Sequence, residues 1–541
     1  MLIGCLVLLG IIFQTLGAEQ VLEEDTVQRY SRSVETMDEL LLLEGYLARN
    51  LENFAEYLSR KAKTIRWGIY QMRKRHRAYR SSGTHVFNPL ESYSLIRHMQ
   101  SDWLMWQLFL EKPVGQEQVA YANSIKSKLP QDHDFFDAAE GLRKLQATYN
   151  MSSNDVARGL LDGVQYNSSL ASIDCLAMAK HLLGEGWLLD AETWILPGLE
   201  ADDGEGAQTE MQLLRGPVKS EFYRTQGKVQ KELENLTGAL QSYQTALKHS
   251  PHDSDIFKEY LNLERRALPP SGIEPEDEED QVDDLQFLPE CCSGRCEVVR
   301  KLRRLYCVYN HVTAPFLRIS PIKTEILSIE PFVAFLHDMV LEKESALIRS
   351  STKKHLLPSA IVSVDAPKGE YKVASSRTSK SVWCPNGFNN ATRMIAKRLG
   401  EATGLDMYHA EFFQVMNYGL GGYFETHIDM LLSNESRFNG TRDRIATALF
   451  YLNDVPQGGG THFPHLNLTV FPKKGSVLFW YNLDFKGDDA MDTLHTGCPV
   501  IVGSKWVVSK WITDVGQEFR RPCIDSISKA KYLKSAERLL I

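Results

Sequence analysis

Apolar residues in the first quarter of the chain recur at steps of three and four, as in the run Leu47, Leu51, Phe54, Leu58, Ala62 and Ile65. This spacing places them along one face of an amphipathic helix. The same few turns fit a core helix of a bundle and the seam of a coiled-coil dimer equally well. We therefore predict an all-helical domain over residues 19–145 with the capacity to self-associate.

Residues 146–252 show the pattern of paired helices. One pair is predicted around 174–194, and a second over 222–233 and 235–248. The second helix of that pair has the residue spacing of a tetratricopeptide repeat, carried by Gly238, Ala239, Tyr243, Ala246, Leu247 and Pro251. Such repeats offer a concave groove for an extended peptide, although a purely structural role is the simpler interpretation of this pattern alone.

The pattern changes after residue 312 to short β-type runs separated by Gly, Pro and Asn, at 412–416, 445–451, 476–480 and 505–512. Repeated short strands of this kind favour a sandwich or jelly roll. Two helices are predicted to precede these strands, around 332–348 and 392–399. The predicted fold is multidomain: an all-α N-terminal half, followed by a double-stranded β-helix over 311–525 and a tail over 526–541.

A linker and cysteine cluster over 253–310 separates the two halves. Residues 274–284 hold eight acidic side chains and no basic one, which accounts for the whole formal net charge of −8. This run is interpreted as a solvated linker rather than a docking site. The basic stretch 61–80 is interpreted as a solvated helix face, because no nucleic-acid-binding motif accompanies it.

Residues 2–16 are almost entirely apolar and are followed by Gly17, Ala18 and an acidic residue. This pattern predicts a signal peptide over 1–18. No later stretch is apolar enough to span a bilayer, so we expect no membrane insertion. Sequons for N-glycosylation fit the same secretory compartment, at Asn150, Asn167, Asn235, Asn390, Asn434, Asn439 and Asn467.

The chain has nine cysteines, of which eight remain after removal of the segment that holds Cys5. Four of them gather at Cys291, Cys292, Cys296 and Cys307, where disulfides and a zinc knuckle are both conceivable. No histidine stands at zinc-finger spacing among them, so disulfides are preferred. The pairing itself is not decided by the sequence.

The candidate chemistry begins with His427 and Asp429, which are two positions apart and so share one face of a strand. His495 follows 68 residues later and can complete a triangle when the strands close into a barrel. Two imidazoles and one carboxylate form the facial triad of non-haem Fe(II) oxygenases. Zinc in a hydrolase is the competing interpretation of the same ligands.

Lys505 favours the oxygenase. It stands ten residues after His495 and alternates with Val507, Ser509 and Trp511 on one strand face. A lysine that points into an apolar barrel is costly unless it meets an anion, and the distal carboxylate of 2-oxoglutarate is a suitable partner. A surface lysine on an edge strand is the alternative.

Seven segments of the C-terminal half closely resemble the α subunits of collagen prolyl 4-hydroxylase, at 414–422, 444–452, 471–475, 479–483, 505–506, 510–511 and 516–523. The resemblance implies that His427, Asp429 and His495 bind Fe(II). It also implies that Lys505 binds the distal carboxylate of 2-oxoglutarate with help from Tyr418 and Thr461. Trp511 and Trp187 are the implied substrate contacts. The implied reaction is 4-hydroxylation of peptidyl proline coupled to decarboxylation of 2-oxoglutarate to succinate, with L-ascorbate keeping the iron reduced.

The same resemblance implies protein disulfide isomerase as the β subunit, self-association through residues 19–145, and retention in the endoplasmic reticulum lumen. It further suggests two disulfides, one between Cys498 and Cys523 and one between Cys307 and a member of the 291–296 cluster.

The chain departs from the family pattern near the proposed site. Phe424 and Thr426 stand where the family usually has Tyr and Pro, and 186–189 reads Gly-Trp-Leu-Leu where the family groove carries tyrosines. These changes leave the reaction type unaffected and bear on the substrate. The expected substrate is a collagen-like X-Pro-Gly sequence. The alternatives are a non-collagen secretory peptide and a non-catalytic peptide-binding scaffold.

Overall fold

The structure is a computed structural model of the 541-residue chain. It describes residues 30–81, 89–201, 218–267, 289–296, 306–362, 371–373, 376–430, 443–484 and 490–521. The predicted signal peptide, the acidic run 274–284, Asn434, Asn439, Cys523 and the C-terminal tail lie outside these residues. The chain forms two compact units, one of residues 35–131 and one of the remainder.

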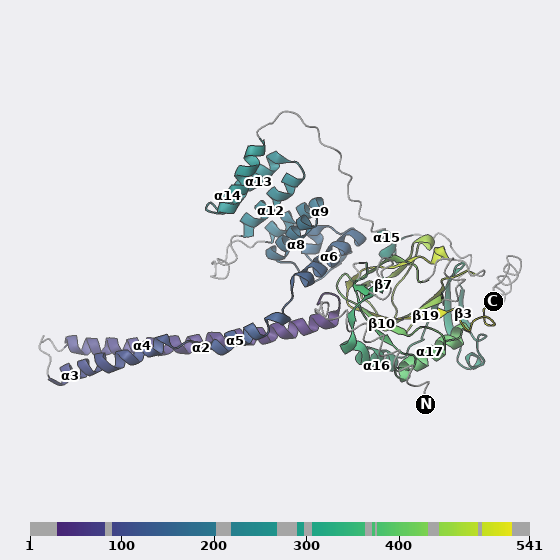
Figure 1. Ribbon diagram of the computed structural model, residues 1–541, viewed down its shortest axis with the longest axis horizontal. Coiled ribbons are helices and arrows are strands. Elements are labelled where there is room, and N and C mark those ends of the chain that lie inside the picture. The colour runs from purple at the N-terminus through teal and green to yellow at the C-terminus, as the bar shows by residue number, and fades with distance from the viewer. Residues whose placement is uncertain are drawn as a thin grey trace. The chain divides into compact units, whose positions relative to one another are not determined.

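The unit of residues 35–131 is a helical hairpin (Figure 1). Its long helix α2 (Val34–Ser81) contains the predicted apolar stripe. The chain runs back along α2 through a series of helices: α3 (Pro89–Arg97), the π-helix η1 (His98–Asp102), α4 (Trp103–Glu111), α5 (Gln116–Ser124) and the short η2 (Lys126–Lys128). Lys61 Nζ donates to the carbonyl oxygens of Leu110 and Lys112 at 2.8 and 2.7 Å. Leu51 and Leu58 are 66% and 46% exposed, so the described part of the chain does not fully cover the stripe.

The helical part of the second unit confirms both predicted helix pairs. The first pair is α8 (Ser172–Gly184) with α9 (Leu188–Thr193), and the second is α12 (Val218–Glu232) with α13 (Leu236–His249). Buried Leu182, Trp194 and Phe222 join them in one core. The other elements here are α6 (Asp132–Tyr149), α7 (Ser153–Ala157), β1 (Leu160–Leu161), β2 (Val164–Gln165), α10 (Ile195–Glu200) and α14 (Ser254–Ala267).

The C-terminal part is a jelly roll built from a nine-stranded and a four-stranded sheet. The larger sheet has the order β3-β4-β5-β16-β12-β19-β10-β9-β6, and the smaller has the order β11-β17-β14-β15. The larger sheet comprises β3 (Tyr306–Asn310), β4 (Ile322–Ile329), β5 (Phe332–Leu336), β6 (Leu357–Pro358), β9 (Lys380–Cys384), β10 (Phe413–Tyr418), β12 (Arg444–Tyr451), β16 (Val477–Tyr481) and β19 (Lys505–Thr513). The smaller comprises β11 (Phe424–His427), β14 (Thr461–Phe463), β15 (Leu468–Val470) and β17 (His495–Gly497).

Short elements connect these strands. They are α15 (Pro289–Cys292), η3 (Pro315–Arg318), η4 (Lys353–His355), β7 (Ala360–Val362), β8 (Tyr371–Val373), β13 (Gln457–Gly458), η5 (Pro464–Leu466), η6 (Met491–Thr493) and β18 (Val500–Val502). Within the described residues, no helix combines the length and apolar character needed to cross a membrane.

Two apolar layers lie on the two faces of the larger sheet. On one face, helices α16 (Glu342–Thr352) and α17 (Asn390–Thr403) bury Ile348, Ile395 and Leu399 against Phe413 and Phe450 (Figure 1). On the other face, residues including Met416, Tyr451, Phe463 and Trp480 fill the space between the two sheets. The four strands predicted from the sequence correspond to β10, β12, β16 and β19 and are confirmed.

The predicted helix over 332–348 is wrong in its first part. Residues Phe332–Leu336 form strand β5, which pairs with β4 and β16, and the helix begins only at Glu342. The run Phe-Val-Ala-Phe-Leu is rich in aromatic and β-branched residues, which fit a pleated sheet better than a helix. Asp338, with φ of 57°, turns the chain between the two elements.

The cysteine pairing also differs from the expectation. Cys292 is bonded to Cys498, and Cys291 to Cys296, while Cys307 is a free and exposed thiol. The pairings of Cys498 with Cys523 and of Cys307 with the cluster are therefore wrong in this structure. The partner of Cys498 is fixed by α15, which lies beside β14 and β15 of the smaller sheet and carries Cys292 toward the end of β17.

Candidate active site

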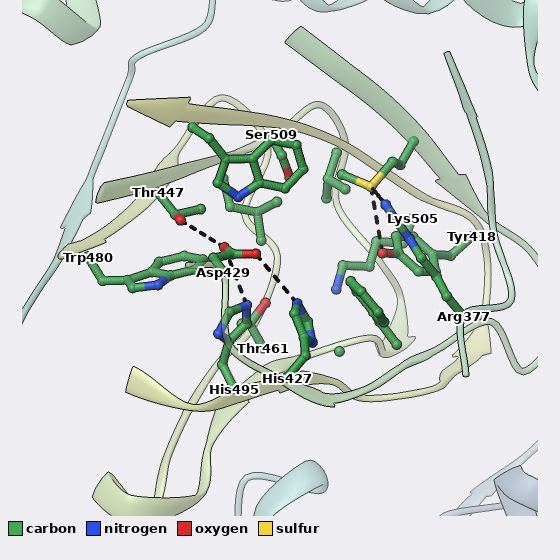
Figure 2. A pocket seen from close by; sticks show the side chains of 16 residues that line it. Arg377, Tyr418, His427, Asp429, Thr447, Thr461, Trp480, His495, Lys505 and Ser509 are labelled. Carbon is green, nitrogen blue, oxygen red and sulfur yellow. Dashed lines mark hydrogen bonds and ion pairs between the residues drawn. The ribbon is translucent and has the colours of Figure 1, made fainter. Parts of the chain in front are cut away.

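The smaller sheet brings the three predicted iron ligands together between the two sheets. In the pairing of β11 with β17, His427 lies directly opposite His495, and Asp429 follows β11 by two residues. One carboxylate oxygen of Asp429 lies 3.7 Å from His427 Nε2, and the other lies 3.7 Å from His495 Nε2. Figure 2 shows these three side chains pointing toward one another. Their ligand atoms lie within 4.8 Å of one another, close enough to bind a single metal ion.

Backbone hydrogen bonds fix which ring nitrogens face the triangle. His427 Nδ1 lies 2.7 Å from the carbonyl oxygen of Glu425, and His495 Nδ1 lies 3.0 Å from that of Thr493. Because a carbonyl oxygen can only accept, each Nδ1 must carry the proton and donate it. Each Nε2 therefore keeps its lone pair toward Asp429, which is the arrangement of a metal-binding histidine.

Neighbouring groups keep the site in the protonation state that a cation requires. Burial and, second to it, the nearby His495 together lower the pKa of His427 to about 3. Burial likewise lowers the pKa of His495. Burial alone would raise the pKa of Asp429, but the two histidines, Arg444 and the Thr447 hydroxyl outweigh it and hold that pKa below its ordinary value. Two neutral imidazoles and one carboxylate result.

Asp429 is anchored from strand β12. Thr447 Oγ1 donates to Asp429 Oδ2 at 2.7 Å, and Asn482 Nδ2 donates in turn to Thr447 Oγ1 at 3.0 Å. Arg444 donates to the carbonyl oxygen of Asp429 at 3.3 Å and forms an ion pair with Glu411. Thr447 thus holds Asp429 through Oδ2, and the other carboxylate oxygen, Oδ1, faces His427.

Lys505, Tyr418 and Thr461 line the same pocket as the triad. Lys505 is the first residue of β19 and pairs with Tyr418, the last residue of β10, and its Nζ lies 5.4 Å from the Tyr418 ring centre. Among the residues that the structure describes, no carboxylate forms an ion pair with Lys505. Burial lowers the pKa of its amine to about 7. Thr461 Oγ1 lies 3.0 Å from the Tyr451 hydroxyl.

The alternation predicted for β19 is confirmed. Lys505, Val507, Ser509 and Trp511 all line the pocket, as Figure 2 shows for the labelled Lys505 and Ser509. The guanidinium carbon of Arg444 lies 3.9 Å from the centre of the Trp511 ring. Trp383 packs beside the same ring, with 5.7 Å between the ring centres. Trp187 lies apart from this pocket, at the N-cap of α9, with the Arg143 guanidinium 4.3 Å above its ring.

Comparison with known proteins agrees with this geometry. A model described as the prolyl 4-hydroxylase alpha-subunit N-terminal region matches residues 33–163, and one of the 2OG-Fe(II) oxygenase superfamily matches residues 413–513. Prolyl 4-hydroxylase subunit alpha-1 of Rattus norvegicus is 30% identical over 509 residues, which cover 91% of this chain and 95% of that protein. The chain belongs to the prolyl 4-hydroxylase α subunit family.

Other members of the prolyl 4-hydroxylase α subunit family align over similar lengths. Subunit alpha-3 of Homo sapiens is 30% identical over 485 residues, covering 83% of this chain and 86% of that protein. A solved viral collagen prolyl hydroxylase from Paramecium Bursaria Chlorella virus-1, in complex with 2OG, is 26% identical. It covers 34% of this chain and 96% of that chain, with a TM-score of 0.28.

Sequence reasoning missed several residues of this family member's pocket. Arg377 is buried there, with its guanidinium 4.6 Å from the Phe424 ring and donating to Gln414 Oε1 at 3.1 Å. Thr447 and Trp480 were also missed, although a lone Thr in the apolar run of β12 is a usable signal. Phe424, noted only as a departure, stacks on the His427 ring with 3.6 Å between ring centres.

Proposed function

We propose that the chain hydroxylates peptidyl proline at C4, coupled to oxidative decarboxylation of 2-oxoglutarate to succinate. The observation that carries this proposal is that one pocket holds the His427–Asp429–His495 triangle and the buried Lys505, whose amine has no carboxylate partner among the described residues. Family membership and the 2OG-Fe(II) oxygenase match over 413–513 support the same reaction. A zinc hydrolase has no use for the buried lysine, so it is the weaker interpretation.

The donor set fits Fe(II). Two neutral Nε2 atoms and one carboxylate oxygen are the ligands of the facial triad and leave open positions for cosubstrate and oxygen. When bound, the iron supplies the oxidative chemistry. The protein holds the ligands in place: backbone carbonyls orient both imidazoles, and Thr447 orients Asp429.

Lys505 is proposed to bind the distal carboxylate of 2-oxoglutarate, with Tyr418 and Thr461 as further polar contacts. Burial disfavours its charge, and an incoming carboxylate restores it. Arg377 places a second cation in the pocket wall and adds to the attraction for a dianion. The pocket is therefore electrostatically incomplete until an anion binds.

The proposed substrate is a proline-rich peptide with collagen-like X-Pro-Gly sequences, positioned near Trp511. Phe424 stacks on His427 and makes the pocket wall apolar at a position where the family usually has the hydroxyl of a tyrosine. A non-collagen secretory peptide is the second candidate, favoured by that wall and by 186–189. A non-catalytic scaffold does not account for the orientation of both histidines.

The organisation of the whole chain follows from the same proposal. Residues 19–145 self-associate, 146–252 bind peptide, and 311–525 catalyse. The exposed leucines of α2 support the first role. A protein disulfide isomerase β subunit, L-ascorbate as reductant and residence in the endoplasmic reticulum lumen after cleavage of residues 1–18 complete the proposal.

The proposal is tested by mass spectrometry of proline-rich peptides incubated with protein, Fe(II), 2-oxoglutarate and ascorbate. A mass gain of one oxygen on proline, with succinate formed, is expected. His427→Ala or His495→Ala should abolish both with little loss of fold, because each removes a ligand rather than core volume. His465→Ala is the matched control, since His465 is a half-exposed histidine outside the pocket, and it should keep full turnover. Near wild-type turnover in either triad variant would contradict the ligand assignment.

A further inference from the structure

A second group of potential ligands lies outside the catalytic pocket. Cys291, Cys296 and His462 place two sulfur atoms and one ring nitrogen within 4.8 Å of one another. Cys291 and Cys296 come from α15 and the turn after it, whereas His462 is the central residue of β14. Along β14, Thr461 lines the catalytic pocket and His462 does not, as the alternation of a strand requires.

The protonation state of His462 follows from one hydroxyl group. Thr469, directly across from His462 in the pairing of β14 with β15, donates its Oγ1 hydrogen to the carbonyl oxygen of Cys291 at 2.6 Å. A hydroxyl has a single hydrogen, so Thr469 Oγ1 can only accept from His462 Nδ1, which lies 3.0 Å away. The proton of the ring therefore resides on Nδ1, and Nε2 holds the lone pair.

No donor in the described part of the chain forms a hydrogen bond with that lone pair. His462 is fully buried, and its Nε2 makes no hydrogen bond there. Burial lowers the pKa of the ring to about 4, so the ring is neutral near pH 7. A buried acceptor without a partner is costly, and a histidine whose other nitrogen donates to an oxygen is the usual form of a metal ligand.

We infer that Cys291, Cys296 and His462 form a redox-gated site for a thiophilic divalent cation such as Zn²⁺. In the disulfide form seen here, both sulfur atoms are bonded to each other and the site is closed. An external dithiol reductant passes two electrons and two protons to the Cys291–Cys296 bond and becomes a disulfide itself. Zn²⁺ then displaces both thiol protons and is held by two thiolates and Nε2, with water in the fourth position.

The environment of the two cysteines suits this exchange. Cys291 is buried, while Cys296 is only half-buried, so a reductant can reach the bond from that side. Gly294, with φ of 73°, forms the turn between the two cysteines. The sequence alone concealed the site, because the histidine stands far from the cysteines along the chain and on another strand.

Co²⁺ added to the full chain tests the inference, because thiolate ligation gives cobalt an intense charge-transfer absorption that the catalytic triad, with no sulfur, cannot produce. The protein is first reduced with a phosphine, which carries no competing thiol. One thiolate-bound Co²⁺ per chain is expected after reduction and none before it, and Zn²⁺ should displace it.

Four variants separate a metal site from a passive disulfide. Cys296→Ser should remove the cobalt absorption. His462→Gln and Thr469→Val should each weaken Co²⁺ binding about ten- to a hundredfold, the second because it frees the ring from its fixed tautomer. His465→Gln is the control and should leave binding unchanged. The inference is overturned if reduced wild-type protein gives no thiolate–cobalt absorption, or if His462→Gln and Thr469→Val bind Co²⁺ as tightly as wild type.

Discussion

At the scale of single residues, strand β19 carries two buried lysines that differ in their hydrogen-bond partners. Lys505 and Lys510 are both buried, and burial lowers the pKa of each to about 7. Lys510 donates to Asn386 and to the carbonyl oxygen of Glu411, so its amine is satisfied by the fold. Lys505 faces the pocket and has no anion among the described residues. Lys505 therefore needs a ligand to provide the hydrogen-bond acceptors that Asn386 and Glu411 provide to Lys510.

Replacement of Lys505 by alanine is therefore expected to raise the KM for 2-oxoglutarate about ten- to a hundredfold. The reason is the loss of a charge-assisted contact worth roughly 1.5–3 kcal/mol. Steady-state kinetics with varied 2-oxoglutarate measure this. Lys510→Ala is the matched control: it should lower the Tm without a selective change in that KM. An unchanged KM in Lys505→Ala would show that the lysine does not bind the cosubstrate.

The lowered pKa of Lys505 also predicts how cosubstrate affinity depends on pH. Only the protonated amine pairs with a carboxylate, and the free protein loses this proton as the pH rises through about 7. The Kd of 2-oxoglutarate should thus increase as the pH is raised above this value, by up to about tenfold per pH unit. Calorimetry on the anaerobic Co²⁺-loaded protein measures it. Lys505→Arg stays charged and should show a much flatter profile; equal slopes would contradict the assignment.

At the scale of elements, β19 serves two cores at once. Its odd-numbered residues from Lys505 to Trp511 face the pocket, and Trp506, Val508 and Ile512 face the helices α16 and α17. The smaller sheet is stabilised by a packed helix and a disulfide. Its outer face receives α15, which is tied to the residue after β17 by the Cys292–Cys498 disulfide across 206 residues of chain. Cys498 stands three residues after His495, one of the proposed iron ligands.

Loss of this disulfide is expected to destabilise the protein. Cys292→Ser combined with Cys498→Ser should lower the free energy of unfolding by about 2–5 kcal/mol, because the crosslink restricts a long loop in the unfolded chain. Urea denaturation of the double variant measures the change. Cys307→Ser, which removes an exposed free thiol, should have no effect. Peptide mapping that joins Cys498 to Cys523 instead of Cys292 would refute the pairing.

At the scale of the whole molecule, the departures from the family pattern spare the triad itself and include residues 186–189 in the helical part. Leu189 is 70% exposed at the start of α9, and Trp187 has the Arg143 guanidinium over its ring. An exposed leucine offers no hydroxyl to the backbone carbonyls of a polyproline II peptide, which have no internal partners. We therefore expect substrate choice and catalytic competence to be set by different parts of the chain.

Leu189→Tyr in the full chain should accordingly tighten binding of a poly-proline peptide, by about three- to tenfold for one added hydrogen bond of roughly 0.5–1.5 kcal/mol. Leu189→Phe adds the ring without the hydroxyl and separates the two contributions. Titration calorimetry measures both. Strong binding by the unmodified protein, unaffected by Leu189→Tyr, would show that the missing hydroxyl does not limit peptide binding and would remove this support for a non-collagen substrate.

The sequence by itself determined what depends on local periodicity. The three-to-four spacing in α2 and the alternation in β19 each follow from the geometry of a single element. The two-residue step from His427 to Asp429 predicted two neighbouring side chains correctly, but β11 ends at His427 and Asp429 lies beyond the strand. The tertiary structure alone decided which distant elements meet: Thr447 against Asp429, Cys292 against Cys498, and His462 against Cys291. These contacts join residues on different elements, so they depend on how the barrel closes. No local pattern of side chains records that closure.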